Sequence, residues 1–502
     1  MDGTDGTAQE PSELVAIDLG SNSFHMIIAK LVGGQLHVID RMRERVKLAA
    51  GLDANKHLTE DAQRRALECL EQFGQRLRTV PEARVRAVGT NTIRKARNAR
   101  EFIGRAREAL GQPIEVISGR EEARLVYLGV AHDLSDDAGR RLVVDIGGGS
   151  TEIILGERFE ARRTESLHMG CVSYTARFFA DGRLRRETFR EATTEAQVEL
   201  EPIKRDFKRL GWVSAVGSSG TINSIDAILR TNGWSEGITY AGLRQLRSAL
   251  IEQGRVDRLS IPALSEERAS VLPGGLAILM GVFKSLRIDQ MMSASGALRE
   301  GLLYDTIGRI QHEDVRETTI DRLSDRFGID REQAARVRAT ARVFLQQVAY
   351  AWDLHHPDHG MLLDWAASLH EIGLAVSFSG HHSHGAYLLT HADMPGFSRD
   401  QQAFLAALVG GHRRRLKPDR IEALRAAGGE TALRLAALLR LAATLNRGRD
   451  PSPLPKLALT AAGPVLELRL PDGWLGKHPM TRADLLKQQE YLEGAGFHFT
   501  VP

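Results

Sequence analysis

Two segments of the chain join a carboxylate to a loop of very small residues. In the first, the apolar residues Val15–Ile17 lead into Asp18 and the loop Gly20–Ser23. In the second, the apolar residues Leu142–Val144 lead into Asp145 and a run of three glycines. A carboxylate at a strand end can hold Mg²⁺, and small residues leave backbone N–H groups open to phosphate oxygens. Two such loops facing each other would grip a phosphate chain from both sides, so the pair predicts phosphoryl chemistry.

The second loop is the more specific of the two. Gly147, Gly148 and Gly149 lose more backbone entropy than a simple hairpin requires, which favours close approach of their N–H groups to anionic oxygens. Glu152 lies on the strand that leaves this loop, within expected reach of the same ion or water as Asp145. The sequence has no Walker-type phosphate loop, which disfavours a P-loop NTPase.

Two other loops that follow predicted strands add groups for binding an anion. In Gly89–Arg94, the Thr90 hydroxyl and the Arg94 guanidinium could clamp a terminal phosphate, although a plain strand-to-helix connection is the alternative. The loop Gly217–Thr221 opens a helix, and a helix N-terminus suits an anion. Both loops would add to the phosphate grip.

A pair of acids, Glu121-Glu122, opens the helix that follows the predicted strand Pro113–Ser118. Acids in the first turn stabilise any helix through its dipole. Alternatively, one of the two points into a cleft and takes a proton from a water that attacks phosphorus. The residues alone leave both interpretations open.

The order of predicted elements divides the chain into regions of different texture. Strands alternate with helices from Leu14 to about Ile307, which indicates α/β layering, and the strand–acid–loop unit occurs in both halves of this stretch. From about His312 to Asn446 the pattern is helical. After the linker Arg447–Pro453, a strand pair, a helix and a final strand predict a small α+β region.

Size and composition set further bounds. At 502 residues the chain is too long for one core, and its net charge of +3 gives no indication of a nucleic-acid partner. The two cysteines, Cys69 and Cys171, are too few for a disulfide framework or a Cys-based zinc site. The first residues do not read as a signal peptide, and the most apolar run, Val271–Phe283, is too short to span a bilayer, so we expect a cytoplasmic protein.

The helical region is rich in histidine and contains one basic run. We expect scattered structural histidines there in preference to a metal site. Basic runs such as His412–Lys417 usually form a solvated face, but a long polyanion could bind one. The histidines concerned are His355, His356, His359, His370, His381, His382, His384, His391 and His412.

Taken together, these residues resemble the exopolyphosphatase / guanosine pentaphosphate phosphohydrolase family. The resemblance is carried by the two acid loops, by Ile117–Gly119 with Glu122–Arg124, and by two further segments, Met169–Ser173 and Ser295–Gly301. It runs through essentially the whole chain, and the chain length favours the long proteobacterial exopolyphosphatases within the family.

The resemblance implies an α/β fold with a two-lobed actin-like, RNase H-like ATPase core and an active site between the lobes. It implies core lobe I at residues 1–126, core lobe II at 127–311, a helical HD-like domain at 312–447 and a small α+β domain at 448–502. It also implies Mg²⁺, commonly K⁺, and a homodimer. A peripheral position at the inner membrane is left open.

The family's functional residues are carried over to matching positions. Glu122 matches the general base, and Asp145 and Glu152 match the acids that hold Mg²⁺ with it. His412, Arg413, Arg414, Arg415 and Lys417 form a predicted polyphosphate-binding surface. The predicted phosphate-binding residues are Asp18, Ser21, Asn22, Ser23, Thr90, Arg94, Gly147, Gly148, Gly149, Ser150, Gly217 and Ser219.

The third region resembles HD-type phosphohydrolases but departs from their metal-binding pattern. The tandem His-Asp is His370-Glu371 here, and Ala443 stands where those proteins usually carry Asp. We therefore expect this region to hold no metal and to serve as scaffold, dimer surface and polyphosphate channel.

The predicted activity is Mg²⁺-dependent release of terminal orthophosphate from inorganic polyphosphate. The closest alternative is hydrolysis of guanosine pentaphosphate (pppGpp) to the tetraphosphate at the same site. A sugar or acetate kinase on the same core would need an acceptor and a nucleoside pocket. A polyphosphate-binding or nucleotide-sensing module without catalysis is disfavoured by the three acids Glu122, Asp145 and Glu152.

Overall fold

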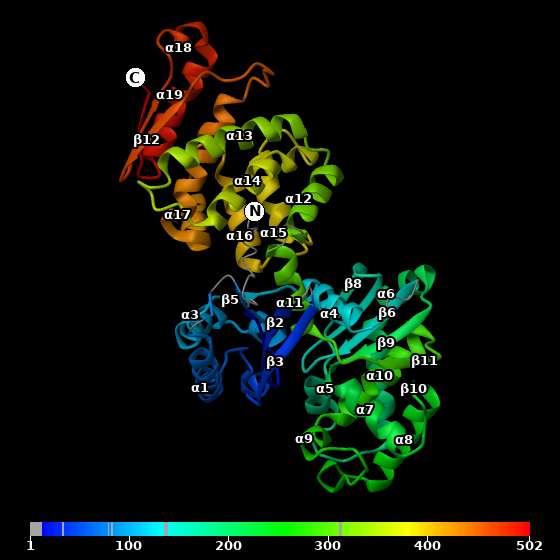
Figure 1. The fold of residues 1–502 in the computed structure, drawn as a ribbon. Helices are drawn as coiled ribbons and strands as arrows, with labels where there is room; N and C mark the ends of the chain where they lie inside the picture. The colour runs from blue at the N-terminus through cyan, green and yellow to red at the C-terminus, as the bar shows by residue number, and fades with distance from the viewer. Residues whose placement is uncertain are drawn as a thin grey trace, which may run out of the picture. The chain divides into compact units, whose positions relative to one another are not determined.

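The computed structural model of the chain describes residues 13–32, 35–78, 80–81, 84–134, 139–310 and 314–501. The chain divides into two compact units, Met1–Asp314 and Val315–Pro502 (Figure 1). The Gly33-Gly34 pair, which in sequence favours a turn, and the predicted boundary between residues 311 and 312 lie outside the described residues.

The first sheet of unit 1 has five strands in the order β3-β2-β1-β4-β5. Strand β1 pairs antiparallel with β2 and parallel with β4. Alternate residues of β1 enter different cores: Val15 and Ile17 join one cluster, and Leu14 and Ala16 join another. Both faces are therefore covered by helices, as expected for a largely apolar strand. The strands are β1 (Glu13–Leu19), β2 (Phe24–Val32), β3 (Gln35–Glu44), β4 (Val85–Gly89) and β5 (Ile114–Val116).

Helices cover this sheet on its two faces. Residues of α1 (Glu60–Leu77) and α3 (Ala99–Leu110) fill the cluster on the Val15 face. Residues of α4 (Gly119–Asp133) and α11 (Leu298–Ile310) fill the cluster on the Leu14 face. The α4–α11 contact is close, because a Cβ on Gly301 would lie 1.8 Å from the Leu125 carbonyl oxygen. The short α2 (Asn91–Lys95) follows β4 directly.

The second sheet has six strands in the order β10-β11-β9-β6-β7-β8. Strand β6 pairs antiparallel with β7 and parallel with β9, which repeats the pattern of β2, β1 and β4 in the first sheet. The repeated strand–acid–loop unit of the sequence is thus also a repeated topology. The strands are β6 (Arg140–Ile146), β7 (Thr151–Glu157), β8 (Glu160–Leu167), β9 (Ser214–Ser218), β10 (Ile238–Thr239) and β11 (Gln290–Ser293).

A layer of helices packs on the second sheet through one apolar cluster. The central α10 contributes the run that is too short to span a bilayer, and nearly every residue of it is buried. In the described residues, no helix is long and apolar enough to cross a membrane. The helices are α5 (Cys171–Phe178), α6 (Arg186–Leu210), α7 (Ser219–Thr231), α8 (Tyr240–Gln253), α9 (Glu266–Ala269) and α10 (Leu272–Leu286).

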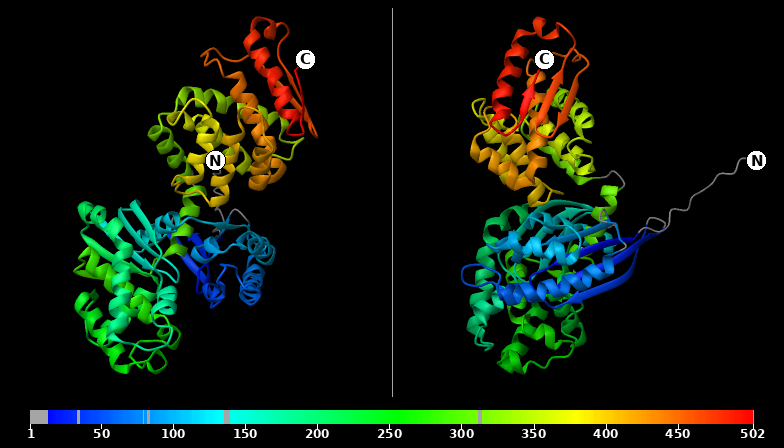
Figure 2. Two further views of the ribbon diagram at one scale, coloured as in Figure 1. Left: turned by 180° about the vertical axis from the view of Figure 1, so that it is seen from behind. Right: turned by 90° about the vertical axis from the view of Figure 1, so that its left-hand side faces the viewer.

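Unit 2 is helical up to residue 445 and ends in a small sheet of order β12-β13-β14 (Figure 2). One hydrophobic core runs through the helices and the small sheet. The α+β region at the end of the chain therefore shares its core with the helical region. The elements are α12 (Val315–Arg326), α13 (Arg331–Val348), α14 (Pro357–Leu369), α15 (His381–His391), α16 (Arg399–Gly411), α17 (Pro418–Leu445), β12 (Ala458–Ala462), β13 (Val465–Arg469), α18 (Trp474–Lys477), α19 (Pro479–Glu493) and β14 (His498–Thr500).

Candidate active site

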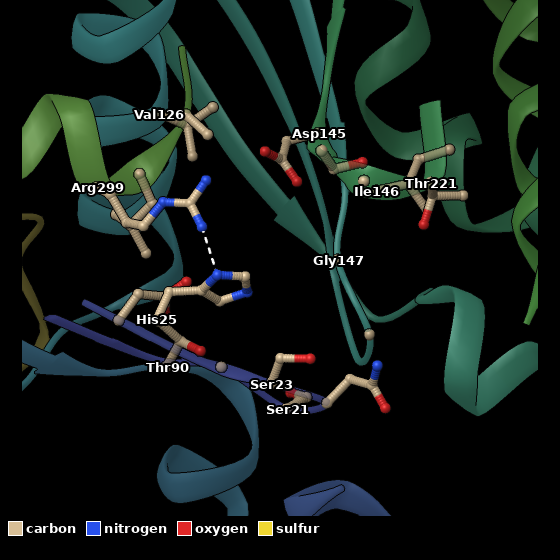
Figure 3. A pocket seen from close by; sticks show the side chains of 18 of the residues that line it. Ser21, Ser23, His25, Thr90, Val126, Asp145, Ile146, Gly147, Thr221 and Arg299 are labelled. Carbon is tan, nitrogen blue, oxygen red and sulfur yellow. Dashed lines mark hydrogen bonds between the residues drawn. The ribbon is translucent and has the colours of Figure 1, made fainter. Parts of the chain in front are cut away.

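A cavity of about 450 Å³ in unit 1 is lined by residues from both sheets (Figure 3). The first-sheet half supplies the β1–β2 loop and Thr90, and the second-sheet half supplies the β6–β7 loop and the start of α7. Predicted site residues that line it are Asp18, Ser21, Asn22, Ser23, Thr90, Glu122, Asp145, Gly147, Gly148, Gly149, Ser150, Glu152 and Ser219. Residues far apart in sequence are thus brought to one place.

The two acid loops lie against each other. A Cβ on Gly148 would lie 3.1 Å from the Ser21 Cβ, and a Cβ on Gly149 would lie 2.7 Å from the Asn91 side-chain oxygen. The Thr92 hydroxyl donates a hydrogen bond of 2.8 Å to the Ser21 hydroxyl and fixes the first loop. Side chains at these glycines would separate the loops, so the small residues serve the close approach.

Four carboxylates line the cavity. Asp18 and Asp145 stand near the ends of β1 and β6, Glu152 faces Asp145 across the β6–β7 hairpin, and Glu122 lies in the first turn of α4. Burial raises the pKa of Asp18 to about 7, with Glu122 and Asp145 adding to the effect against Arg299. Burial and Glu122 raise the pKa of Asp145 to about 7. Burial, Glu122 and Asp145 raise the pKa of Glu152 well above its usual value.

The carboxylate oxygens that line the cavity are chemically suited to bind a divalent cation. Asp18 Oδ1 is buried and has no hydrogen-bond partner among the described residues, and Mg²⁺ prefers carboxylate oxygens. The predicted ligands Asp145, Glu152 and Glu122 line one cavity, but no three His, Cys, Asp or Glu side chains of the described residues form a ready-made metal site. Mg²⁺ usually keeps waters and binds one or two carboxylates plus substrate phosphates, which suits this partial set.

The raised carboxyl pKa values predict a pH-dependent stability that Mg²⁺ reverses. A carboxyl group whose pKa is higher in the folded than in the unfolded state contributes its full stabilisation of the fold at pH values below the unfolded pKa. This contribution to the free energy of unfolding is lost as the pH rises through the folded pKa. In EDTA, the melting temperature of unit 1 should therefore fall between about pH 4 and about pH 8, whereas added Mg²⁺ should raise it most at the upper end. Thermal melts at each pH check this, with Asp145→Asn as the variant that should flatten both trends. Mg²⁺ stabilisation that is independent of pH would contradict it.

Arg94 does not line the cavity as predicted. Its Nη1 donates to Glu122 Oε2 at 2.8 Å and to the Ile117 carbonyl oxygen at 2.9 Å, and its side chain is buried. Arg94 therefore orients the carboxylate of Glu122 from outside the cavity lining, and its role at a phosphate stays a prediction.

In the loop before α7, one predicted residue serves packing and another lines the cavity. Gly217 does not line the cavity: a Cβ there would lie 2.4 Å from the Ile222 side chain, so the glycine allows α7 to pack on its strand. Ser219 does line the cavity, and its φ of 88° is a left-handed conformation unusual for serine. Packing therefore accounts for Gly217, whereas Ser219 lines the cavity, and the phosphate role of this loop stays a prediction.

Several basic lining residues were not predicted. Arg299 Nη1 lies 2.5 Å from His25 Nδ1, and burial together with Arg299 lowers the pKa of His25 to about 3, so the imidazole is neutral. Arg41, Arg43 and Arg268 also line the cavity. The alternation of Arg41 and Arg43 along one strand was a usable signal, since residues two apart share a face.

The predicted basic surface of unit 2 is split by the fold. His412, Arg413 and Arg414 line a second cavity within unit 2, whereas Arg415 and Lys417 do not. His370 and His381 line the same cavity, and the other predicted histidines lie outside it. His412 is buried because it sits at the end of α16, packed beside His370 and His381.

Comparison with known proteins agrees with this arrangement. Residues 27–310 match the Ppx/GppA phosphatase family, and residues 315–489 match Ppx/GppA phosphatase, domain III. The chain belongs to the Ppx/GppA phosphatase family. A family member of Aeromonas hydrophila subsp. hydrophila, named guanosine-5'-triphosphate,3'-diphosphate pyrophosphatase, is 40% identical over 96% of this chain and 97% of its own. A protein of the same name from Vibrio cholerae serotype O1 is 43% identical over 94% of both chains.

Solved structures of Ppx/GppA proteins match the fold. An exopolyphosphatase from Cytophaga hutchinsonii aligns with a TM-score of 0.54 and 25% identity, covering 59% of this chain and 98% of its own. The Aquifex aeolicus member aligns with a TM-score of 0.51 and 27% identity, covering 60% and 98%. The predicted two-lobed actin-like α/β core, followed by a helical region and a small α+β region, is confirmed.

Proposed function

We propose that the chain hydrolyses the terminal phosphoanhydride of guanosine 5′-triphosphate 3′-diphosphate and releases orthophosphate. The observation that carries this is the near-full-length similarity, at 40 and 43% identity, to relatives named for that substrate. This similarity favours pppGpp, the alternative substrate considered from the sequence, over polyphosphate as the main substrate. Inorganic polyphosphate is the second candidate substrate, because it ends in the same terminal phosphoanhydride as pppGpp.

The charges of the cavity support a substrate with phosphates at two ends. The lining includes the four carboxylates and the glycine loop. It also includes Arg41, Arg43 and Arg268, and burial together with Arg43 lowers the pKa of Arg268. A cation crowded by another cation gains from a bound anion. The 5′-phosphates would lie at the acids and the 3′-diphosphate at these arginines.

For this hydrolysis the chain mainly has to position the substrate and the attacking water and to neutralise the charge of the phosphoryl group. Mg²⁺, held by Asp145, Glu152 and the substrate phosphates, would supply charge neutralisation at the phosphoryl group. Glu122, oriented by Arg94, accepts a proton from the attacking water. The backbone N–H groups of Gly147–Gly149 and the Ser150 hydroxyl bind the equatorial oxygens, and the released product is orthophosphate. K⁺ dependence, a homodimer and a cytoplasmic position, including one peripheral to the inner membrane, belong to the same proposal.

The direct test is phosphate release from pppGpp, from long-chain polyphosphate and from tripolyphosphate, with Mg²⁺ and no acceptor present. We expect the highest kcat/KM on pppGpp, and Mg²⁺ removal should abolish release from all three. A higher kcat/KM on polyphosphate would overturn the nucleotide assignment. Release that requires a sugar or acetate acceptor would show a kinase, and binding without release would show a non-catalytic module.

The arginine group predicts a substrate-selective loss. Arg268→Gln should raise KM for pppGpp about 10-fold, as expected for one charge-assisted hydrogen bond, because the 3′-diphosphate loses a partner. KM for tripolyphosphate should stay within about two-fold, because that short chain ends near the acids. Arg258→Gln, an exposed arginine outside the cavity, is the matched control. Equal losses on both substrates would place Arg268 at the reacting phosphate instead.

A further inference from the structure

Unit 2 contains its own cavity, of about 340 Å³, between α13, α15, the end of α16, α17 and α19. Its lining carries more positive than negative charge. The cations are Arg413, Arg414, Arg447, Arg449 and Lys487, and the acids are Glu371 and Asp484. All of its lining residues belong to unit 2, whereas the four carboxylates of the candidate active site belong to unit 1.

Both acids of the cavity already have guanidinium partners. Arg449 Nη2 contacts the two carboxylate oxygens of Glu371 at 2.7 and 2.8 Å, and Arg447 Nη1 contacts Asp484 Oδ1 at 2.6 Å. In the part of the chain that the structure describes, Arg413, Arg414 and Lys487 have no carboxylate within ion-pair distance. The cavity therefore has a surplus of cations that an anion would neutralise.

The same contacts disfavour a metal ion here. Arg413 Nη1 lies 2.9 Å from His381 Nδ1, and Arg449 occupies Glu371. A metal would have to displace two guanidinium groups from the side chains that could ligate it. The described residues also contain no cluster of His, Cys, Asp and Glu that could hold a metal.

The cavity wall is held by buried polar groups. Arg440 is completely buried, and it donates to the Gly411 carbonyl oxygen at 2.5 Å and to the Arg414 carbonyl oxygen at 2.6 Å. Its Nη2 also donates to Gln488 Oε1 at 3.0 Å. Arg414 itself has a φ of 63°, the left-handed region that side chains rarely adopt. Strained backbone conformations such as that of Arg414, held in place here by the buried Arg440, are concentrated at ligand-binding and active sites in proteins.

Two histidines that line the cavity offer acceptor atoms to a ligand. The Nδ1 atoms of His370 and His412 each lie 2.7 Å from a backbone carbonyl oxygen, so Nδ1 carries the proton and Nε2 accepts. Burial lowers the pKa of both imidazoles, which keeps them neutral. A simple phosphate chain has no donors for these atoms, whereas hydroxyl or amino groups do.

From the surplus cations Arg413, Arg414 and Lys487 and the neutral acceptors His370 and His412, we propose that unit 2 binds a phosphorylated small molecule that also carries hydroxyl or amino donors, as a nucleotide does. Its phosphates lie at the three cations, and its donors face the two imidazoles. This site is independent of the reaction proposed for unit 1.

Lys487 provides a local readout, because it is exposed and lines the cavity. The full chain is acetylated in the presence of Mg²⁺ with a non-hydrolysable imido analogue of GTP, with tripolyphosphate or with guanosine, and labelling of each lysine is measured by mass spectrometry. We expect the analogue to reduce labelling of Lys487 at least about five-fold at a concentration where tripolyphosphate gives less protection and guanosine gives none. Lys456, which is exposed and outside the cavity, is the internal control and should label unchanged.

The double change Arg413→Gln and Arg414→Gln should abolish protection of Lys487, and Arg415→Gln, the next residue and outside the cavity, should retain it. Melting curves of each variant verify folding. Unprotected Lys487 in the wild-type chain, or protection that survives the double change, would overturn the site. Equal protection by tripolyphosphate and the analogue would overturn the role of the imidazoles. Because labelling needs no turnover, these outcomes do not depend on the activity of unit 1.

Discussion

Glu122→Gln is expected to lower kcat for phosphate release by about 10²–10⁴-fold, the usual contribution of a general base. The amide keeps the size of the side chain and its contact with Arg94 but cannot accept the proton of the attacking water. KM should change little, since the glycine loop and the arginines that line the cavity, to which we assign phosphate binding, remain. Steady-state phosphate release from pppGpp with Mg²⁺ measures both constants.

The matched control is Glu121→Gln, one residue earlier in the same helix turn. Glu121 does not line the cavity, and its two carboxylate oxygens accept hydrogen bonds of 2.8 Å from Arg124. We expect a loss of kcat below about 10-fold for this variant. Unchanged turnover in Glu122→Gln, or equal losses in the two variants, would show that Glu122 is not the base.

Asp305→Asn is expected to destabilise unit 1 by about 3–5 kcal/mol. Asp305 is buried and accepts from Arg86, from Arg124 at 2.5 Å and from Arg309 at 3.1 Å. Burial alone would raise the pKa of Asp305, but Arg124, Arg86 and Arg309 hold it far below its usual range. Removal of this charge leaves a buried cluster of guanidinium groups with too little compensation.

Urea denaturation gives the free energy of unfolding, and hydrogen exchange of α4 and α11 peptides locates the change. Because the folded pKa of Asp305 is depressed, its stabilisation is present above the unfolded pKa and is lost as pH falls through the folded one. The destabilisation by Asp305→Asn should therefore shrink in acid. The control Asp257→Asn removes an exposed acid that pairs with Arg255 and should leave the free energy of unfolding close to that of the wild-type chain. A similar small change for Asp305 would contradict the argument.

Local sequence was enough to predict the elements that carry the acids. The apolar runs before Asp18 and Asp145 became β1 and β6, and the small loops after them lie against each other, because turn chemistry and strand pattern are short-range properties. The helical periodicity of Thr59–Arg78, with Thr59 as a candidate N-cap, likewise predicts a helix from local sequence. This helix is α1, with Thr59 at its N-cap but without a capping hydrogen bond from the side chain.

The surroundings of the other site residues depend on tertiary packing, which the local sequence does not show. Gly217 resembles a phosphate loop in sequence, yet the contact of its strand with Ile222 explains the glycine. The sequence predicts that Arg94 binds phosphate. In the structure Arg94 pairs with Glu122, which lies on a different helix, so this contact is not visible in the local sequence. Arg43 and Arg268 come from distant segments that meet at one cavity, which no local pattern contains.

The pairing of Asp145 with Glu152 across the β6–β7 hairpin has a consequence for how this enzyme can diversify. Directly opposed strand residues are spaced by backbone hydrogen bonds, so the separation of the two acids is insensitive to which side chains fill the core below. The arginines stand elsewhere, on β3 and α9. With the proposed roles of the arginines and the acids, substitutions on β3 and α9 would change which phosphorylated substrate binds and leave the spacing of Asp145 and Glu152 unchanged, so one scaffold could yield enzymes of different selectivity.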